Sequence, residues 1–144
     1  MNRVTTRGFT LIELVVVIAL LGILAAFALP RFASLESEAR AATVQGLAGS
    51  LRSSSAMAHG LFLATGNTTV TMEGVDIDTI NGYPTAEDIV NTLSDTTGFT
   101  AGAVTSGVVT ITKDGAATAA QCSVQYTEAG SGGAPQFLVN VDDC

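Results

Sequence analysis

Residues that carry most enzyme chemistry are scarce in this chain. It has one histidine and two cysteines among 144 residues. The cysteines, Cys122 and Cys144, do not form a pair at metal-binding spacing, and no glycine-rich segment ends in the Gly-Lys that holds a phosphate. No grouping of serine, histidine and aspartate indicates nucleophilic catalysis. The sequence therefore predicts a chain that is not an enzyme, with no catalytic residues and no cofactor.

Candidate metal ligands are equally few. His59 has no cysteine or second histidine near it in sequence, so we expect it on a helix surface without a ligand role. Asp76 with Asp78, and Asp142 with Asp143, are the only acidic pairs that could hold calcium. Calcium takes about six to eight oxygen ligands in one place, and short acidic pairs on exposed turns are more often solvated charge. No metal site is predicted.

Basic residues are outnumbered. Six lysines and arginines stand against thirteen aspartates and glutamates, which gives a formal net charge of -7. Removal of residues 1–8 with Arg3 and Arg7 would leave four basic residues against thirteen acids, a net charge of -9. An electrostatic surface for nucleic acid needs the opposite sign, so no nucleic-acid partner is expected.

One long apolar run dominates what is present. Residues 9–29 read FTLIELVVVIALLGILAAFAL and contain a single charge, Glu13. As a helix rising about 1.5 Å per residue, this run would reach roughly 30 Å, the thickness of a bilayer core. We therefore predict a hydrophobic transmembrane helix over residues 9–30. Arg3 and Arg7 before it favour a cytoplasmic N-terminus.

Glu13 is unusual inside such a run, because an unpaired charge there costs about 2.5 to 3.5 kcal/mol on insertion scales. In one interpretation it lies near the helix end and reaches the lipid headgroups. In another, cleavage between Gly8 and Phe9 creates an amine at Phe9, with which Glu13 pairs in the same chain or in a neighbour.

Three other interpretations of the run compete. A secretory signal could be cut at Ala26-Phe27-Ala28, but the length of the run, Glu13 and Pro30 argue against it. A plain membrane anchor explains the helix but not the Gly-Phe-x-x-x-Glu spacing. A buried core helix needs more interior than so short a domain offers.

Arg7-Gly8 followed by Phe-Thr-Leu-Ile-Glu-Leu, with Gly22 and Pro30 further on, resembles the prepilin signature of type IV pilins and type II secretion pseudopilins. The resemblance implies that a membrane peptidase and methyltransferase cuts between Gly8 and Phe9 and methylates the new amine of Phe9. It also makes Glu13 the assembly charge, which neutralises the Phe9 amine of an adjacent subunit.

The same resemblance implies a life cycle. The chain would first be a single-pass inner-membrane protein and would then join copies of itself in a helical filament, an extracellular pilus that serves surface attachment. Its partners would include the inner-membrane pilus assembly machinery. Pro30 is interpreted either as a helix end at the membrane boundary or as part of a segment, Gly22 to Pro30, that loosens when subunits pack.

The remaining sequence predicts an α+β fold in which a long helix packs on a small antiparallel sheet. The predicted divisions are a leader (1–8), the hydrophobic helix (9–30), an amphipathic half of the same helix (31–65) and a globular β head (66–144). Leu47, Leu51, Ala58 and Phe62 recur at helical spacing and should pack on the sheet. The strands are expected at 68–72, 75–80, 107–112, 121–127 and 136–142, with a short helix at 85–94 capped by Thr85.

Cys122 and Cys144 are expected to form a disulfide if the chain is exported to an oxidising compartment. In a cytosolic protein they would instead be two free thiols. Tyr83-Pro84-Thr85-Ala86, the segment 122–129 and the last cysteine resemble, within the pilins, the mannose-sensitive haemagglutinin (MSHA) type of major pilin. The alternatives are a secretion pseudopilin and, in a different class, a membrane-anchored or secreted binding module.

Overall fold

The structure is a computed structural model that describes residues 8–144, apart from the side chains of residues 28–34. The predicted leader up to Arg7 and the side chain of Pro30 lie outside the described residues. The chain divides into two compact units, Met1–Glu36 and Ser37–Cys144. Each unit is described by itself.

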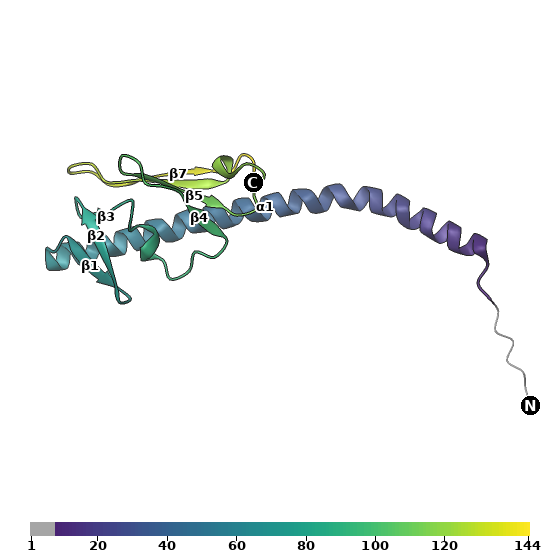
Figure 1. The fold of residues 1–144 in the computed structure, drawn as a ribbon, viewed down its shortest axis with the longest axis horizontal. Coiled ribbons are helices and arrows are strands. Elements are labelled where there is room, and N and C mark those ends of the chain that lie inside the picture. Colours follow the sequence, from purple (N-terminus) through teal and green to yellow (C-terminus); the bar gives the residue numbers. More distant parts are fainter. Residues whose placement is uncertain (1–7) are drawn as a thin grey trace, which may run out of the picture. The chain divides into compact units, whose positions relative to one another are not determined.

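One helix contributes to both units. α1 (Leu11–Thr65) contains 55 residues and continues through Gly22 and Pro30, so the helix does not end at Pro30 (Figure 1). It ends where the sequence predicts. The Gly66 N–H donates to the carbonyl oxygen of Phe62 at 2.7 Å, and Gly66 adopts a φ of 73°, the left-handed conformation that commonly closes a helix.

Two antiparallel sheets make up the rest of the second unit. The three-stranded sheet has the order β1 (Thr69–Met72), β2 (Val75–Ile80), β3 (Tyr83–Pro84). The four-stranded sheet has the order β4 (Phe99–Ala101), β5 (Val108–Lys113), β6 (Ser123–Thr127), β7 (Gln136–Asn140). Together with α1 they confirm the predicted α+β class. Sequence analysis missed β3 and β4, which have only two and three residues.

The prediction of a short α-helix at 85–94 is wrong. Only a 3₁₀ turn, η1 (Val90–Thr92), forms there, and a second one, η2 (Ala119–Gln121), precedes β6. Thr85 does cap the segment, since its hydroxyl accepts from the Asp88 N–H at 3.2 Å. The residues that follow include the β-branched Ile89, Val90 and Thr92, whose side chains lower helix propensity. The Thr92 hydroxyl also donates to the Ile89 carbonyl, so side chains satisfy backbone groups that an α-helix would use.

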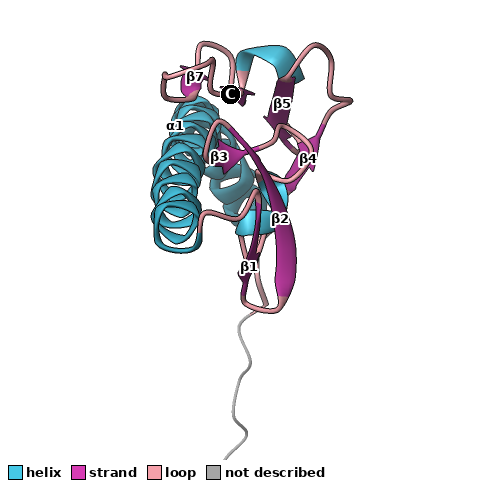
Figure 2. Cartoon of the chain, turned by 90° about the vertical axis from the view of Figure 1, so that its left-hand side faces the viewer, coloured by secondary structure: helices cyan, strands magenta, loops and turns pink. Residues whose placement is uncertain are grey.

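The larger core lies between α1 and the four-stranded sheet. Val44, Leu47, Ala48 and Leu51 stand at positions i, i+3, i+4 and i+7 and are buried, so they form one apolar face of the helix. Figure 2 shows the strands beside the helix. The sheet contributes the alternating buried residues Val109, Ile111, Val124 and Tyr126. This confirms the predicted packing of Leu47 and Leu51 on the sheet.

A smaller core lies under the first hairpin. Ala58 of α1 is fully buried against Val70, Met72 and Ile77 of β1 and β2, with the half-buried Phe62 packed beside them. The predicted stripe on α1 is therefore divided between two sheets. Three side-chain to backbone hydrogen bonds connect β3 and its flanks with the end of β6: Tyr126 to Pro84, Asn81 to Ala129, and Glu128 with Ala86.

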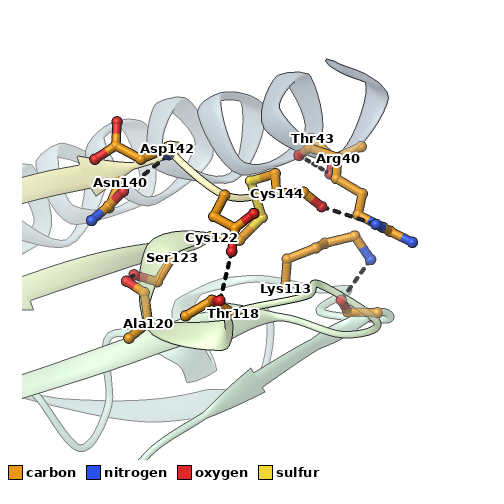
Figure 3. Close-up of a disulfide and its surroundings, with 12 residues drawn as sticks. Arg40, Thr43, Lys113, Thr118, Ala120, Cys122, Ser123, Asn140, Asp142 and Cys144 are labelled. Carbon is orange, nitrogen blue, oxygen red and sulfur yellow. Dashed lines mark hydrogen bonds between the residues drawn. A yellow bond between two sulfur atoms is a disulfide. The ribbon is translucent and has the colours of Figure 1, made fainter. Parts of the chain in front are cut away.

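The two cysteines form a disulfide whose Cα atoms lie 4.8 Å apart, and both residues are buried. It attaches the last residue to the segment that leads into β6, and the Arg40 guanidinium of α1 donates to the Cys144 carbonyl oxygen at 2.9 Å (Figure 3). Nearby, the Thr118 hydroxyl donates to Asp143 at 2.6 Å. The segment after β7 is thus held covalently and by hydrogen bonds.

Candidate functional site

The candidate site is the start of α1, where Thr10 and Glu13 cap the helix reciprocally. The backbone N–H of Thr10 donates to Glu13 Oε2 at 2.9 Å, and the Thr10 hydroxyl donates to the same oxygen at 2.7 Å. In return, the Glu13 N–H donates to Thr10 Oγ1 at 3.3 Å. This is a capping box, which satisfies backbone donors that the first helical turn leaves open.

The capping box fixes one oxygen of Glu13 and leaves the other available. In the part of the chain that the structure describes, Glu13 Oε1 accepts no hydrogen bond. A carboxylate can accept about four hydrogen bonds through its two oxygens. Glu13 can therefore keep its contacts with Thr10 while Oε1 accepts from an amine of another molecule.

Apolar side chains surround this charge. Phe9, Ile12, Val16 and Val17 line, together with Glu13, a shallow hollow of about 350 Å³. Phe9 is 76% exposed and Phe27 is 77% exposed. The other exposed large apolar residues between them are Leu11, Ile12, Leu14, Val15, Val16, Val17, Ile18, Leu20, Leu21, Ile23 and Leu24.

An apolar surface of this extent marks a segment that contacts another molecule or lipid. Within the described residues, however, no helix is both long enough and apolar enough to qualify as a membrane span. The transmembrane helix expected over residues 9–30 therefore stays a prediction.

The structure locates the other predicted site residues as follows. Gly8 and Phe9 precede α1 and are exposed, and Phe9 lines the same hollow as Glu13. Gly22 lies within α1, and a Cβ built at that position would meet nothing within 4 Å. Pro30 belongs to α1 by its backbone. Cys122 and Cys144 lie in the second unit, in the disulfide described above.

Thr10 is the residue of this candidate site that the sequence analysis missed. The signal was available, because Thr-x-x-Glu before an apolar run is the pattern of a capping box. His59, which the sequence predicts on a helix surface, makes contacts that the sequence does not indicate. It is half-buried, its Nδ1 lies 2.8 Å from the Gly82 carbonyl oxygen, and its ring stacks on Tyr83 with centroids 4.0 Å apart. That contact joins residues far apart in sequence, so no local pattern indicates it.

Both carboxylates of the first acidic pair have protein partners. Asp76 accepts from the Thr71 hydroxyl at 2.9 Å, and Asp78 accepts from the Thr69 hydroxyl at 2.7 Å. Among the described residues, no three histidine, cysteine, aspartate or glutamate side chains are grouped so that they could hold a metal ion.

Comparison with known proteins bears on this end of the chain. Residues 4–29 match the family described as the prokaryotic N-terminal methylation motif, so the chain carries that motif. The match includes Gly8, Phe9 and Glu13. Such a motif is a substrate for another enzyme, and it fits the expectation that this chain is not itself an enzyme.

A curated relative extends the comparison. The chain is 50% identical over 52 residues to the type IV narrow pilus major component PilA5 of Thermus thermophilus. The aligned region covers 36% of this chain and 45% of that relative. No solved structure matches the chain.

Proposed function

We propose that this protein is the structural subunit of a type IV pilus. The observation that carries the proposal is the methylation motif at residues 4–29, placed at the start of a helix whose first turns expose a continuous apolar surface. Exposure of so much apolar surface to water is unfavourable, and contact with lipid or with other chains removes that cost. The similarity to the type IV narrow pilus major component PilA5 supports the same function.

The proposed cycle begins with processing. The prepilin peptidase and methyltransferase cuts between Gly8 and Phe9 and methylates the Phe9 amine. The chain then resides in the inner membrane, with its N-terminus on the cytoplasmic side, until the assembly machinery transfers it to an extracellular filament. The exposed position of Gly8 and Phe9 before α1 supports access by the peptidase.

Glu13 would set the position of each subunit in the filament. Its Oε1 is open, and it lies beside the apolar side chains that line the same hollow, so a neighbour that packs on this surface would bring its Phe9 amine to the charge and exclude water from it. Packing of the apolar helices would supply cohesion and the charge pair would supply register, which is the best-attested use of a buried polar pair. Loosening of α1 between Gly22 and Pro30 on packing is part of the same proposal.

Surface attachment is the proposed role of the filament. The finer assignment to the mannose-sensitive haemagglutinin type rests only on residues 83–86, residues 122–129 and the last cysteine. The comparisons lend that subtype no support.

The intact mass of the protein sheared from the cell surface tests the proposal. We expect a chain that begins at N-methylated Phe9 and gains two hydrogen atoms when its disulfide is reduced. A chain that begins at Leu29 would instead indicate a secretory signal. A chain that keeps residues 1–8 and stays in the membrane fraction would indicate an anchored module, and either result would overturn the proposal.

A further inference from the structure

A second site candidate lies in the globular unit, away from the start of α1. A hollow of about 400 Å³ is lined by His59 of α1, Asn81 of the β2–β3 turn, Tyr83 of β3, and Gly132, Gly133 and Ala134 of the glycine-rich loop. Its volume falls in the range of small-molecule sites. The described hydrogen bonds of the unit leave several polar groups of this lining unused.

The histidine presents an acceptor. Its Nδ1 lies 2.8 Å from the Gly82 carbonyl oxygen, and because a carbonyl only accepts, Nδ1 carries the proton. In the neutral ring, Nε2 is then an acceptor, and no described residue donates to it. Its tautomer is therefore set by the turn on which it packs.

Two other side chains keep free hydrogen-bonding capacity. The Asn81 amide nitrogen donates to the Ala129 carbonyl oxygen at 2.7 Å, which orients the side chain and leaves its amide oxygen as an acceptor. The Tyr83 hydroxyl makes no hydrogen bond with any described residue. Among the same residues, the Gly132 N–H is also without an acceptor.

The lining also has an apolar part and no formal charge. The His59 and Tyr83 rings are nearly parallel, with an interplanar angle of 3°, and form one rigid aromatic block. None of the six lining residues is an aspartate, glutamate, lysine or arginine. A ligand that matches this lining is neutral, donates and accepts several hydrogen bonds, and has C–H groups to place on a ring.

We propose that this hollow binds a single neutral sugar unit. Sugar hydroxyls can donate to the Asn81 oxygen and His59 Nε2 and can accept from the Gly132 N–H, while sugar C–H groups contact the aromatic block. The hollow is held in shape by the Asn81 to Ala129 and His59 to Gly82 hydrogen bonds, which reduces the ordering cost of binding. The inference does not depend on filament assembly.

The test uses the full chain in micelles of a detergent without a sugar headgroup. Saturation-transfer difference NMR would be recorded with the methyl glycosides of glucose, galactose, mannose and N-acetylglucosamine, each at about 5 mM, because a shallow site is expected to bind with a millimolar Kd. We expect transfer to at least one glycoside. Absence of transfer to all four would overturn the proposal.

Two variants locate the signal. Ala134→Leu places a larger side chain in the hollow and should reduce the transfer at least about fivefold. Ala103→Leu makes the same change at an exposed position that does not line the hollow, and should leave the transfer at the wild-type level. Equal transfer in wild type and Ala134→Leu would place binding elsewhere and contradict the inference.

Tyr83→Phe separates the hydroxyl from the ring. It keeps the stacking on His59 and removes one hydrogen-bonding group, so the Kd of the bound glycoside should rise about three- to tenfold. An unchanged Kd would exclude the Tyr83 hydroxyl from the contact and would overturn this part of the assignment.

Discussion

The Tyr126 hydroxyl donates a 2.6 Å hydrogen bond to the Pro84 carbonyl oxygen, and Tyr126 is fully buried. The bond joins β6 of the four-stranded sheet to β3 of the three-stranded sheet. β3 has only two residues and lies at the edge of its sheet, and the side chain that donates to its last carbonyl comes from the other sheet. The contact therefore connects the two sheets through one buried bond.

Tyr126→Phe should lower the free energy of unfolding by about 1 to 3 kcal/mol, because it leaves the Pro84 carbonyl buried without a donor while keeping the ring. Urea denaturation followed by circular dichroism measures the change. Tyr83→Phe is the matched control, since the Tyr83 hydroxyl bonds to no described residue, and it should change stability by less than about 0.5 kcal/mol. Equal losses in the two variants would contradict the role of the bond.

Stability should fall at alkaline pH because of the same residue. Burial is the main reason that the pKa of Tyr126 is raised well above its ordinary value. Below a pH of about 10 the phenol is protonated in both states, so it contributes no pH dependence. Above that pH the unfolded chain releases the proton first. The free energy of unfolding then declines as pH rises, with a slope that corresponds to at most one released proton. Urea titrations between pH 9 and about 11 should show a steeper decline in wild type than in Tyr126→Phe.

Gly49→Ala should stabilise the globular unit by about 0.5 to 1 kcal/mol, because glycine is costly in a helix and an added Cβ meets nothing within 4 Å. Gly82→Ala is the opposite case. Gly82 has a φ of 84°, and a Cβ there would lie 2.7 Å from the Phe62 ring and 2.9 Å from His59 Nδ1. Thermal unfolding should therefore shift upward for the first variant and downward for the second. A stabilised Gly82→Ala would show that the turn moves freely on the helix.

Glu13→Ala should impair filament assembly while leaving the globular unit within about 0.5 kcal/mol of wild-type stability, because Glu13 belongs to the other compact unit. Electron microscopy and the amount of sheared protein measure assembly. Glu38→Ala is a suitable control, since it removes an exposed acid from the same helix. Normal filaments from Glu13→Ala would contradict the proposed charge pairing.

Replacement of both cysteines by alanine should lower the free energy of unfolding by about 3 kcal/mol, the value that chain entropy gives for a loop of this length. The sequence separation of the cysteines is 22. Guanidinium titrations of the oxidised wild type and the double variant measure the difference. A loss below about 1 kcal/mol would indicate that the hydrogen bonds around Arg40 and Thr118 hold the segment without the disulfide.

The sequence was most informative where contacts follow a local period. The apolar spacing of Leu47 and Leu51 predicted a buried helix face, and Val75 to Ile80 was predicted with the observed bounds. β3 and β4 are not predicted because two or three residues are too few to show an alternating apolar pattern. The stacking of His59 on Tyr83 is not predicted because it joins residues that are far apart in sequence.

At the candidate site, the sequence supplied the residue types but not their geometry. Glu13 stands out as the single charge in an apolar run, and the resemblance to the prepilin signature singles out Gly8 and Phe9 with it. The sharing of one Glu13 oxygen by two donors of Thr10 requires coordinates, because it depends on the side-chain rotamers at the first helical turn.

The disulfide also determines what a protease could release. The exposed glycine-rich stretch 130–133 lies between Cys122 and Cys144, inside the covalent ring that the disulfide closes. A single cut in that stretch would open the ring without detaching either piece. The nicked protein would migrate as one chain in a non-reducing gel and would separate into two fragments only after reduction.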